Sequence, residues 1–475
     1  MKKETEIHDF EQYCDEMLKK YNVPGFAIGL AKESEWNYKK EFGFRDTEAK
    51  LPLSPDTIFG VGSLTKAFTA VAILQLQEKG KLNLNDPVIN YLPEFKTPNE
   101  VQTKQITIHH FLTHTSGIPP LATLMGAVKK SMEKDLSLEE NQQQEDPLDA
   151  IQAIDTYAEL MDTIAKTAFT PIGVPGTEFS YSNDAYALLG AIIERISGKP
   201  YELYVQENIL EPAGMHHSGF QLEDLEYEDI AVLYDTQQKD DEEMIVRSNN
   251  PLDAPAMRAA GFLKSTVNDM LQFAEIIRND GMVGDMRILS PESVASMTTP
   301  YIECEKGTCY GYGLMIIPDF FGYKLIQHGG DIKGSAAQMN ILPEIGLTGI
   351  SLANVAGAPS SNLLFGAFAN YLGKPIDATH LNVEFVDLAL ESLKEFEGTF
   401  LSGDGLKIEF YVEDDSLHLA AAGLADAVLH PIGDDQFLFT MKEMDSIIHF
   451  MRDEDKQIDR IEFAFRQIPK VEEGN

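Results

Sequence analysis

The stretch that decides the fold is Gly62-Ser63-Leu64-Thr65-Lys66, which leads into an apolar run at residues 67–74. The run predicts a helix, and the three-residue spacing places the side chains of Ser63 and Lys66 on one helical face. A hydroxyl and an amine within reach of each other are the components of a nucleophile and its base. The helix start also favours an oxyanion beside the serine. Alone the pattern is weak, because a capping serine and a solvated lysine give the same spacing.

Composition limits the classes of partner. The chain has 475 residues and a formal net charge of −38. Nucleic acids and anionic membranes bind basic surfaces, so this charge argues against both as partners. No segment has the length of an apolar membrane span, and the helical spacing of Phe10, Tyr13, Met17 and Leu18 predicts an amphipathic helix rather than a signal peptide. The three cysteines suit a reducing compartment, and we therefore expect a cytoplasmic protein.

The order of strand and helix patterns predicts an α+β fold. Strand patterns lie on both sides of a long helical interior, at residues 23–30, 38–44, 311–317, 324–328, 338–342 and 348–354. An apolar helix at 363–372 follows them. This order fits an antiparallel sheet flanked by helices plus a mostly helical lobe, in a domain over residues 1–380.

Three other regions depart from this pattern. Residues 120–170 are rich in Met, Gln and Glu, and we expect an insertion that roofs a cleft. The acidic stretch 223–243 is expected to be a solvated loop. Residues 385–475 carry short alternating apolar segments, which predict a small antiparallel sheet or barrel without a catalytic constellation of its own.

Two further motifs contain residue types that serve acyl transfer. Tyr181-Ser182-Asn183 precedes a helix predicted at 185–196, and His328-Gly329-Gly330-Asp331 ends the strand at 324–328. Each taken alone is more often a capped helix start or a glycine turn. His110 and His114 have the spacing of metal ligands on a helix, but no glutamate completes a His-Glu-x-x-His pattern, so no metal site is expected.

Together the three motifs resemble those of the serine beta-lactamase-like superfamily, which includes penicillin-binding proteins, class C beta-lactamases, D-aminopeptidases and related esterases. Residues 106–119, 211–215 and 260–270 are similar to other landmarks of that family. The resemblance covers residues 7–375, and the C-terminal region resembles the lipocalin-like appendage of some members.

The resemblance implies a mechanism. Ser63 would attack a carbonyl and form an acyl-enzyme, with Lys66 and Tyr181 acting as one coupled base. A lysine with the ordinary pKa of about 10.4 would be protonated, so burial or a nearby cation would have to lower it. The backbone N–H groups of Ser63 and Asp331 would form the oxyanion hole. The positions implied in substrate binding are Asn183, His328, Gly329 and Gly330. No cofactor and no metal is implied.

One departure from the family pattern bears on the substrate. Many beta-lactamases and cell-wall peptidases carry Lys-Thr-Gly at the positions that correspond to residues 328–330 of this chain. The lysine of that motif helps to hold a substrate carboxylate. His328 is a weaker, pH-dependent cation, which puts carboxylate recognition in doubt unless Lys333 compensates.

We therefore expect a serine hydrolase of the peptidase or esterase type, acting on small peptides, amides or esters. A D-alanyl-D-alanine carboxypeptidase or beta-lactamase remains an alternative, as does a binding or assembly scaffold without activity. The expected partner is a small molecule or short peptide, and the oligomeric state stays open, a homo-oligomer included.

Overall fold

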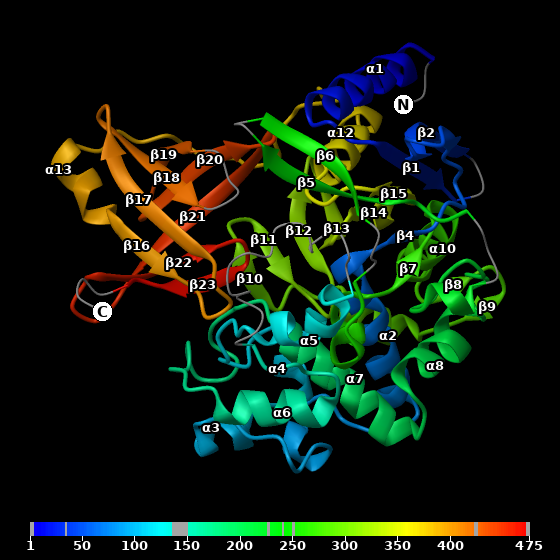
Figure 1. The fold of residues 1–475 in the computed structure, drawn as a ribbon, viewed down its shortest axis with the longest axis horizontal. Helices are drawn as coiled ribbons and strands as arrows, with labels where there is room; N and C mark the ends of the chain where they lie inside the picture. Colours follow the sequence, from blue (N-terminus) through cyan, green and yellow to red (C-terminus); the bar gives the residue numbers. More distant parts are fainter. Residues whose placement is uncertain are drawn as a thin grey trace.

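The computed structural model describes residues 4–33, 36–134, 151–225, 229–239, 242–248, 252–421 and 426–471. Within them the chain forms two units, each with its own sheet and its own apolar core. Figure 1 shows the two units side by side, the C-terminal one in orange and red. The predicted α+β class, with a small all-β unit at the end of the chain, is confirmed.

A nine-stranded antiparallel sheet forms the centre of the first unit, in the order β10-β11-β12-β13-β14-β15-β1-β2-β3. The strands are β1 Gly25–Lys32, β2 Trp36–Asp46, β3 Leu51–Pro52, β10 Ile302–Glu305, β11 Thr308–Tyr310, β12 Met315–Phe320, β13 Tyr323–Ile332, β14 Ser335–Leu342 and β15 Leu347–Ala353. The N-terminal hairpin therefore joins the late strands, with Gly29 opposite Ile350.

Helices cover both faces of this sheet. Alternate residues of β1 enter different cores, because successive side chains of a strand point to opposite faces. Phe26 and Ile28 pack in the core beneath α1 (Glu4–Lys20) and α12 (Ser360–Tyr371), whereas Ala27 belongs to the core of the opposite face. Burial on both faces explains why β14 and β15 are buried throughout their length.

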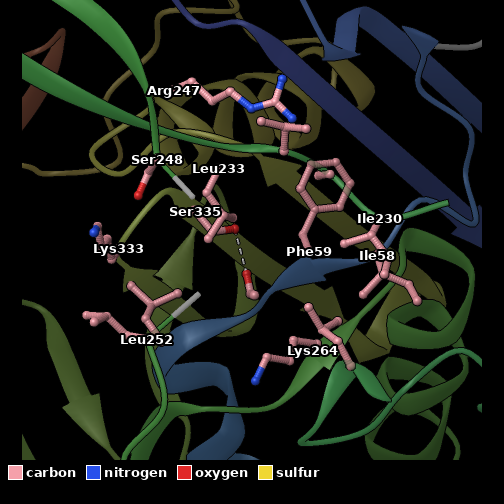
Figure 2. Close-up of a pocket in the computed structure, with 15 residues that line it drawn as sticks. Ile58, Phe59, Ile230, Leu233, Arg247, Ser248, Leu252, Lys264, Lys333 and Ser335 are labelled. Carbon is pink, nitrogen blue, oxygen red and sulfur yellow. Dashed lines mark hydrogen bonds between the residues drawn. The ribbon is translucent and has the colours of Figure 1, made fainter. Parts of the chain in front are cut away.

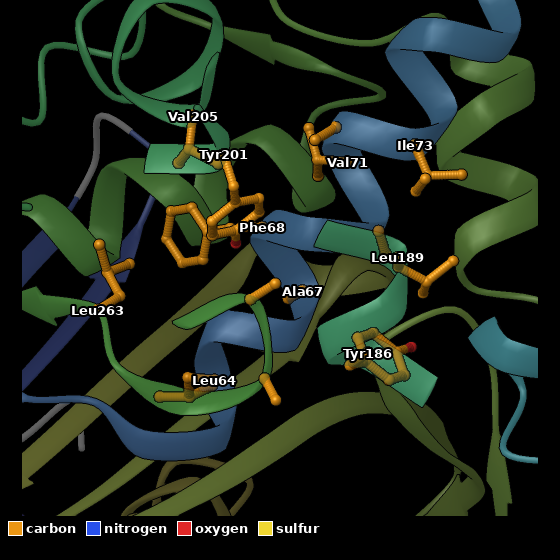
Figure 3. Packing of buried hydrophobic residues seen from close by; sticks show 14 of the residues in the cluster. Leu64, Ala67, Phe68, Val71, Ile73, Tyr186, Leu189, Tyr201, Val205 and Leu263 are labelled. Carbon is orange, nitrogen blue, oxygen red and sulfur yellow. The ribbon is translucent and has the colours of Figure 1, made fainter. Parts of the chain in front are cut away.

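The helical lobe lies between β3 and β10 in the chain. Its helices are α2 Thr65–Glu78, α3 Glu100–Gln105, α4 Ile108–Leu112, α5 Thr123–Met132, α6 Tyr157–Lys166, α7 Asn183–Ser197, α8 Tyr201–Val205, α9 Arg258–Gly261, α10 Val267–Arg278 and α11 Pro291–Met297. Every residue of α2 from Thr65 to Leu76 is buried. Figure 3 shows its Phe68 and Val71 among side chains of α7 and α8, a packing that holds the first turn of α2 in place.

The second unit is an eight-stranded antiparallel sheet in which each strand pairs with the next along the chain. Its elements are α13 Leu390–Leu393, β16 Gly398–Leu401, β17 Lys407–Glu413, β18 Ser416–Ala421, β19 Ala427–Gly433, β20 Gln436–Met441, β21 Met444–Arg452, β22 Ile458–Phe463 and β23 Arg466–Pro469. A bridge between Phe400 and Lys470 nearly closes the sheet into a barrel. Phe400, Phe410 and Phe450 meet edge to face in the interior, so apolar side chains fill it.

Two local expectations need correction, and a third remains a prediction. The acidic stretch is not simply a loop, because β5 (Leu233–Lys239) and β6 (Glu242–Ser248) pair as a hairpin, anchored where Tyr234 N–H donates to Asn354 O. The pattern of residues 106–118 predicts a helix from Thr107 to Gly117, but the helix ends at Leu112, because His114 has a left-handed φ of +57°. The insertion contributes α5 and α6 to the lobe. Its residues 135–150 lie outside the described residues, so its role as a roof stays a prediction.

Candidate active site

Ser63 and Lys66 lie together at the start of α2. Ser63 belongs to a 3-10 turn over Gly62–Leu64, and Lys66 follows one turn later, fully buried. The Lys66 Nζ lies 3.1 Å from Ser63 Oγ. It also donates to the side-chain oxygen of Asn183 at 2.8 Å and to the carbonyl oxygen of Ala260 at 2.6 Å. Two of the three sequence motifs therefore meet at a single nitrogen atom.

The environment of Lys66 disfavours its charged form. Burial lowers the pKa of Lys66 well below its ordinary value, and the positive charge of Arg466 lowers this pKa further. Among the described residues no carboxylate forms an ion pair with it. An amine of reduced pKa, hydrogen-bonded to a hydroxyl, can accept a proton from that hydroxyl near neutral pH.

Tyr181 lies against this pair. Its ring centre is 4.6 Å from Lys66 Nζ. Its hydroxyl is buried near the Ser63 hydroxyl and forms no regular hydrogen bond within the described part of the chain. Burial raises the pKa of Tyr181, and the nearby Ser63 hydroxyl and Arg466 charge offset only part of that rise. At neutral pH Tyr181 is therefore a phenol with a proton to give, beside an amine that can receive one.

His114 supports Tyr181 from behind. The two rings lie 4.3 Å apart between centres, and His114 Nδ1 accepts a hydrogen bond from the backbone N–H of Ser182 at 3.0 Å. Burial lowers the pKa of His114 well below its ordinary value, so the ring is neutral. His110 instead caps the start of α4, because its Nδ1 accepts a hydrogen bond from the Thr107 N–H. The two histidines therefore serve local structure.

His328 differs from the expected cation. Its Nδ1 lies 2.6 Å from the carbonyl oxygen of Gly329, and its Nε2 lies 3.2 Å from the Tyr310 hydroxyl. This pattern assigns the proton to Nδ1 and makes Nε2 the acceptor from Tyr310. Burial lowers the pKa of His328 to about 4, so the side chain is uncharged at neutral pH. It cannot hold a carboxylate as a lysine would.

Lys333, which the sequence offered as a compensating cation, lies elsewhere. It is 3.6 Å from Asp235 and lines a separate cavity, shown in Figure 2. None of Ser63, Lys66 and Tyr181 lines that cavity.

Two glycines allow β13 to approach the Ser63 turn. A Cβ on Gly330 would lie 2.0 Å from the carbonyl oxygen of Val61 and 3.0 Å from the backbone nitrogen of Ser63. A Cβ on Gly62, whose φ is +50°, would lie 2.8 Å from the backbone nitrogen of Asp331. The two nitrogens expected in the oxyanion hole thus belong to segments in direct contact. At Gly329 a Cβ would meet the Gln338 side chain instead, at 2.9 Å.

The C-terminal barrel also reaches this site, which the sequence did not predict. The turn between β22 and β23 carries Ala464 and Phe465 at positive φ, and the carbonyl oxygen of Phe465 accepts the backbone N–H of Tyr181 at 2.9 Å. Gln467 donates to Glu178 at 2.9 Å. Arg466 therefore lies beside the site, where Asp404 accepts from its Nε at 3.0 Å. Two-residue hairpin turns with positive φ usually contain Asn or Gly. The Phe at position 465 is therefore the one feature of the sequence that indicates a contact of this turn with another part of the chain.

This geometry agrees with the comparisons with known proteins. A family model described as Beta-lactamase matches residues 10–365, well over half of the chain. The chain belongs to the beta-lactamase family. A structure of the octameric penicillin-binding protein homologue from Pyrococcus abyssi is 30% identical, has a TM-score of 0.68, and matches over 97% of this chain and 99% of that chain. Both units of this beta-lactamase family member are therefore included in the match.

Two other similar proteins match over less of the chain. A D-stereospecific amidohydrolase from Streptomyces sp. is 24% identical with a TM-score of 0.57 over 74% of this chain and 95% of its own, which shows a shared fold. Protein flp of Staphylococcus aureus (strain MW2) is 32% identical over 234 residues, which are 48% of this chain and 42% of that protein. The chain thus spans less than half the length of that relative.

The described residues also limit other kinds of site. No group of three or more His, Cys, Asp or Glu side chains in them is placed to hold a metal ion. No helix in the described ranges is long and apolar enough to cross a membrane.

Proposed function

We propose that the protein is a serine hydrolase that transfers the acyl group of small peptides, amides or esters to water through an acyl-enzyme on Ser63. One observation carries the proposal: the buried Lys66 Nζ lies 3.1 Å from Ser63 Oγ, and burial lowers the pKa of this lysine. A buried lysine with no carboxylate partner in the described part of the chain is costly for a purely structural residue. The cost argues for a function and against a scaffold without activity.

The proposed reaction begins with a proton transfer. Ser63 Oγ forms a bond to the substrate carbonyl carbon while its proton passes to Lys66 Nζ. The carbonyl oxygen becomes an oxyanion, which accepts hydrogen bonds from the backbone N–H groups of Ser63 and Asp331. The bond to the amine or alcohol then breaks, and the leaving group takes a proton from Tyr181, which recovers one from Lys66. A water molecule then attacks the acyl carbon and gives a proton to Lys66. The ester bond to Ser63 breaks, Ser63 takes that proton back, and the acid is released.

The environment of His328 supports the peptidase or esterase branch. Its pKa of about 4 leaves no charge where the Lys-Thr-Gly enzymes carry a lysine. Substrate binding by Asn183 and by the β13 segment at Gly329 and Gly330 then relies on hydrogen bonds rather than on a salt bridge. The D-stereospecific amidohydrolase of shared fold supports testing D-aminoacyl amides first.

A carboxypeptidase or beta-lactamase remains the second candidate, because one observation favours it. Arg466 of the barrel brings a positive charge close enough to lower the pKa values of both Lys66 and Tyr181. A guanidinium in that place could bind a substrate carboxylate.

The octameric Pyrococcus abyssi homologue, matched over both units, supports a homo-oligomer as the working assembly of this protein.

A panel of D- and L-aminoacyl amides, short-chain p-nitrophenyl esters, a D-alanyl-D-alanine peptide and nitrocefin tests this proposal. We expect turnover of amides or esters, abolished in Ser63→Ala, and slower turnover of the two carboxylate-bearing substrates. Preferred turnover of the peptide or of nitrocefin would select the second candidate. No turnover of any substrate by the folded protein would contradict hydrolase activity.

A further inference from the structure

A cavity of about 220 Å³ lies beside the candidate active site and shares no residue with it. It opens beneath the β5–β6 hairpin, which contributes Leu233 and Ser248. Its floor includes Ser335, whose hydroxyl donates to the carbonyl oxygen of Gly60 at 2.8 Å. A volume of this size exceeds the share of about 30 Å³ that one water takes in the liquid several-fold, so it can hold an organic molecule.

The lining has an apolar side and a polar side. Figure 2 shows Ile58, Phe59 and Ile230 on one side of the cavity, and Ser248 and Lys333 on the other. The strand pairing explains the polar side. Leu233 lies opposite Ser248, and Asp235, two residues further along the same face, lies 3.6 Å from Lys333 Nζ. Ser248 and Lys333 therefore meet the same face of the hairpin.

The charged side chains among the described lining residues are all positive. They are Arg247, Lys264 and Lys333, and this described part of the lining holds no Asp or Glu. In the whole chain acidic residues outnumber basic ones by 76 to 38, so the positive charge of these lining side chains is opposite in sign to the net charge of the protein. Lys264 is buried, and its Nζ donates to the carbonyl oxygen of Phe220 without an ion pair to a described carboxylate. The other two lining cations have carboxylate partners, because Arg247 pairs with Asp46 and Glu48 and Lys333 lies beside Asp235.

Ser248 supplies a second, independent observation. The residue is only 4% exposed, and its hydroxyl has no hydrogen-bond partner among the described residues. Buried hydroxyls are normally paired, and an unpaired one that lines a cavity points to a missing partner there. An oxygen atom of a ligand would satisfy it.

We propose that this cavity binds a medium-chain monocarboxylate. The hydrocarbon chain packs on the side formed by Ile58, Phe59 and Ile230, and the carboxylate accepts hydrogen bonds from Ser248 Oγ and Lys333 Nζ. Lys264 adds a positive charge at the cavity wall, whereas Asp46 and Glu48 balance the charge of Arg247. The proposal does not depend on acyl transfer at Ser63, since the cavity shares no residue with that site.

Octanoate and its uncharged amide, octanamide, are the probes for isothermal titration of the full chain. We expect one saturable octanoate site per chain and at least tenfold weaker binding of octanamide. Lys333→Met should remove most of this preference, whereas Lys104→Met, an exposed lysine on α3, should retain it. Ser248→Ala should weaken octanoate, and Ile230→Trp should block both probes by filling the cavity.

Two results would overturn the proposal. One is the lack of saturable octanoate binding by the wild-type protein at millimolar concentration. The other is an octanoate preference that survives Lys333→Met. Circular dichroism of each variant checks the fold, and titration of Ser63→Ala separates this site from hydrolysis, because its octanoate affinity should equal that of the wild type.

Discussion

The backbone N–H of Tyr181 donates a 2.9 Å hydrogen bond to the carbonyl oxygen of Phe465, at the tip of a barrel hairpin. The same hairpin tip packs on the aromatic cluster that contains Tyr181 and Tyr310. The barrel is therefore part of the wall of the candidate active site, and the residue after Phe465 is the arginine whose charge acts on Lys66.

Arg466→Gln should move the acidic limb of the kcat/KM pH profile to higher pH. The Arg466 charge lowers the pKa of Lys66, so its loss raises that pKa and leaves more of the lysine protonated and inactive at a given pH. Arg466→Lys keeps the charge and should keep the limb near its wild-type position. An unchanged profile in the glutamine variant would show that this charge does not act on the base.

Lys66→Met should lower kcat/KM for the best substrate by about 10³-fold or more, because it removes the proposed base from Ser63. The side chains are similar in length, so the buried site stays filled. Kinetics at saturating and limiting substrate give the measurement. Lys79→Met, at the other end of the same helix, is the control and should keep its activity. A Lys66→Met variant with near wild-type kcat/KM would assign the base elsewhere.

Gly330→Ala and Gly329→Ala form a matched pair on β13. The Cβ at residue 330 would lie 2.0 Å from the Val61 carbonyl, so the segment must shift away from Ser63. A shift of about 1 Å in such a site costs about 10²-fold in rate, and we expect that loss in kcat/KM. At residue 329 the Cβ meets a side chain, Gln338, which can move. Equal activities of the two variants would contradict the close approach.

His328→Gln should make the protein less sensitive to acid. The pKa of His328 is about 4 in the folded protein against 6.5 ordinarily, so the unfolded chain binds an extra proton between these values and stability falls as pH drops. From pH 7 to pH 5 this costs about 2 kcal/mol, which glutamine removes. Urea unfolding at both pH values measures it. An equal loss in wild type and variant would show that His328 is not buried in neutral form.

Local patterns made the three motifs predictable from the sequence. The spacing of Ser63 and Lys66 follows from helix geometry, and the period-two alternation of residues 23–30 identified β1. Charge and burial were not predictable in the same way. A histidine titrates near neutral pH, so the residue type alone predicts a cation at His328, whereas its burial against Tyr310 depends on the packing of distant elements.

Contacts between distant segments account for the other omissions. Phe465 and Arg466 reach Tyr181 only because the barrel docks on the first unit, and no periodicity within either segment records that docking. The strands of the β5–β6 hairpin are not predicted by their sequence. Residues 235–243 are all polar or charged, so they lack the apolar alternation that indicates a strand.

The most direct test of the central claim is active-site labelling of the full chain with a fluorophosphonate, read by peptide mass spectrometry. A fluorophosphonate reacts with a serine only when a base activates the hydroxyl. The expected result is one adduct, on Ser63, lost in Ser63→Ala and formed far more slowly in Lys66→Met. An adduct on another residue, or none on the folded wild-type protein, would contradict the assignment of Ser63 and Lys66 as nucleophile and base.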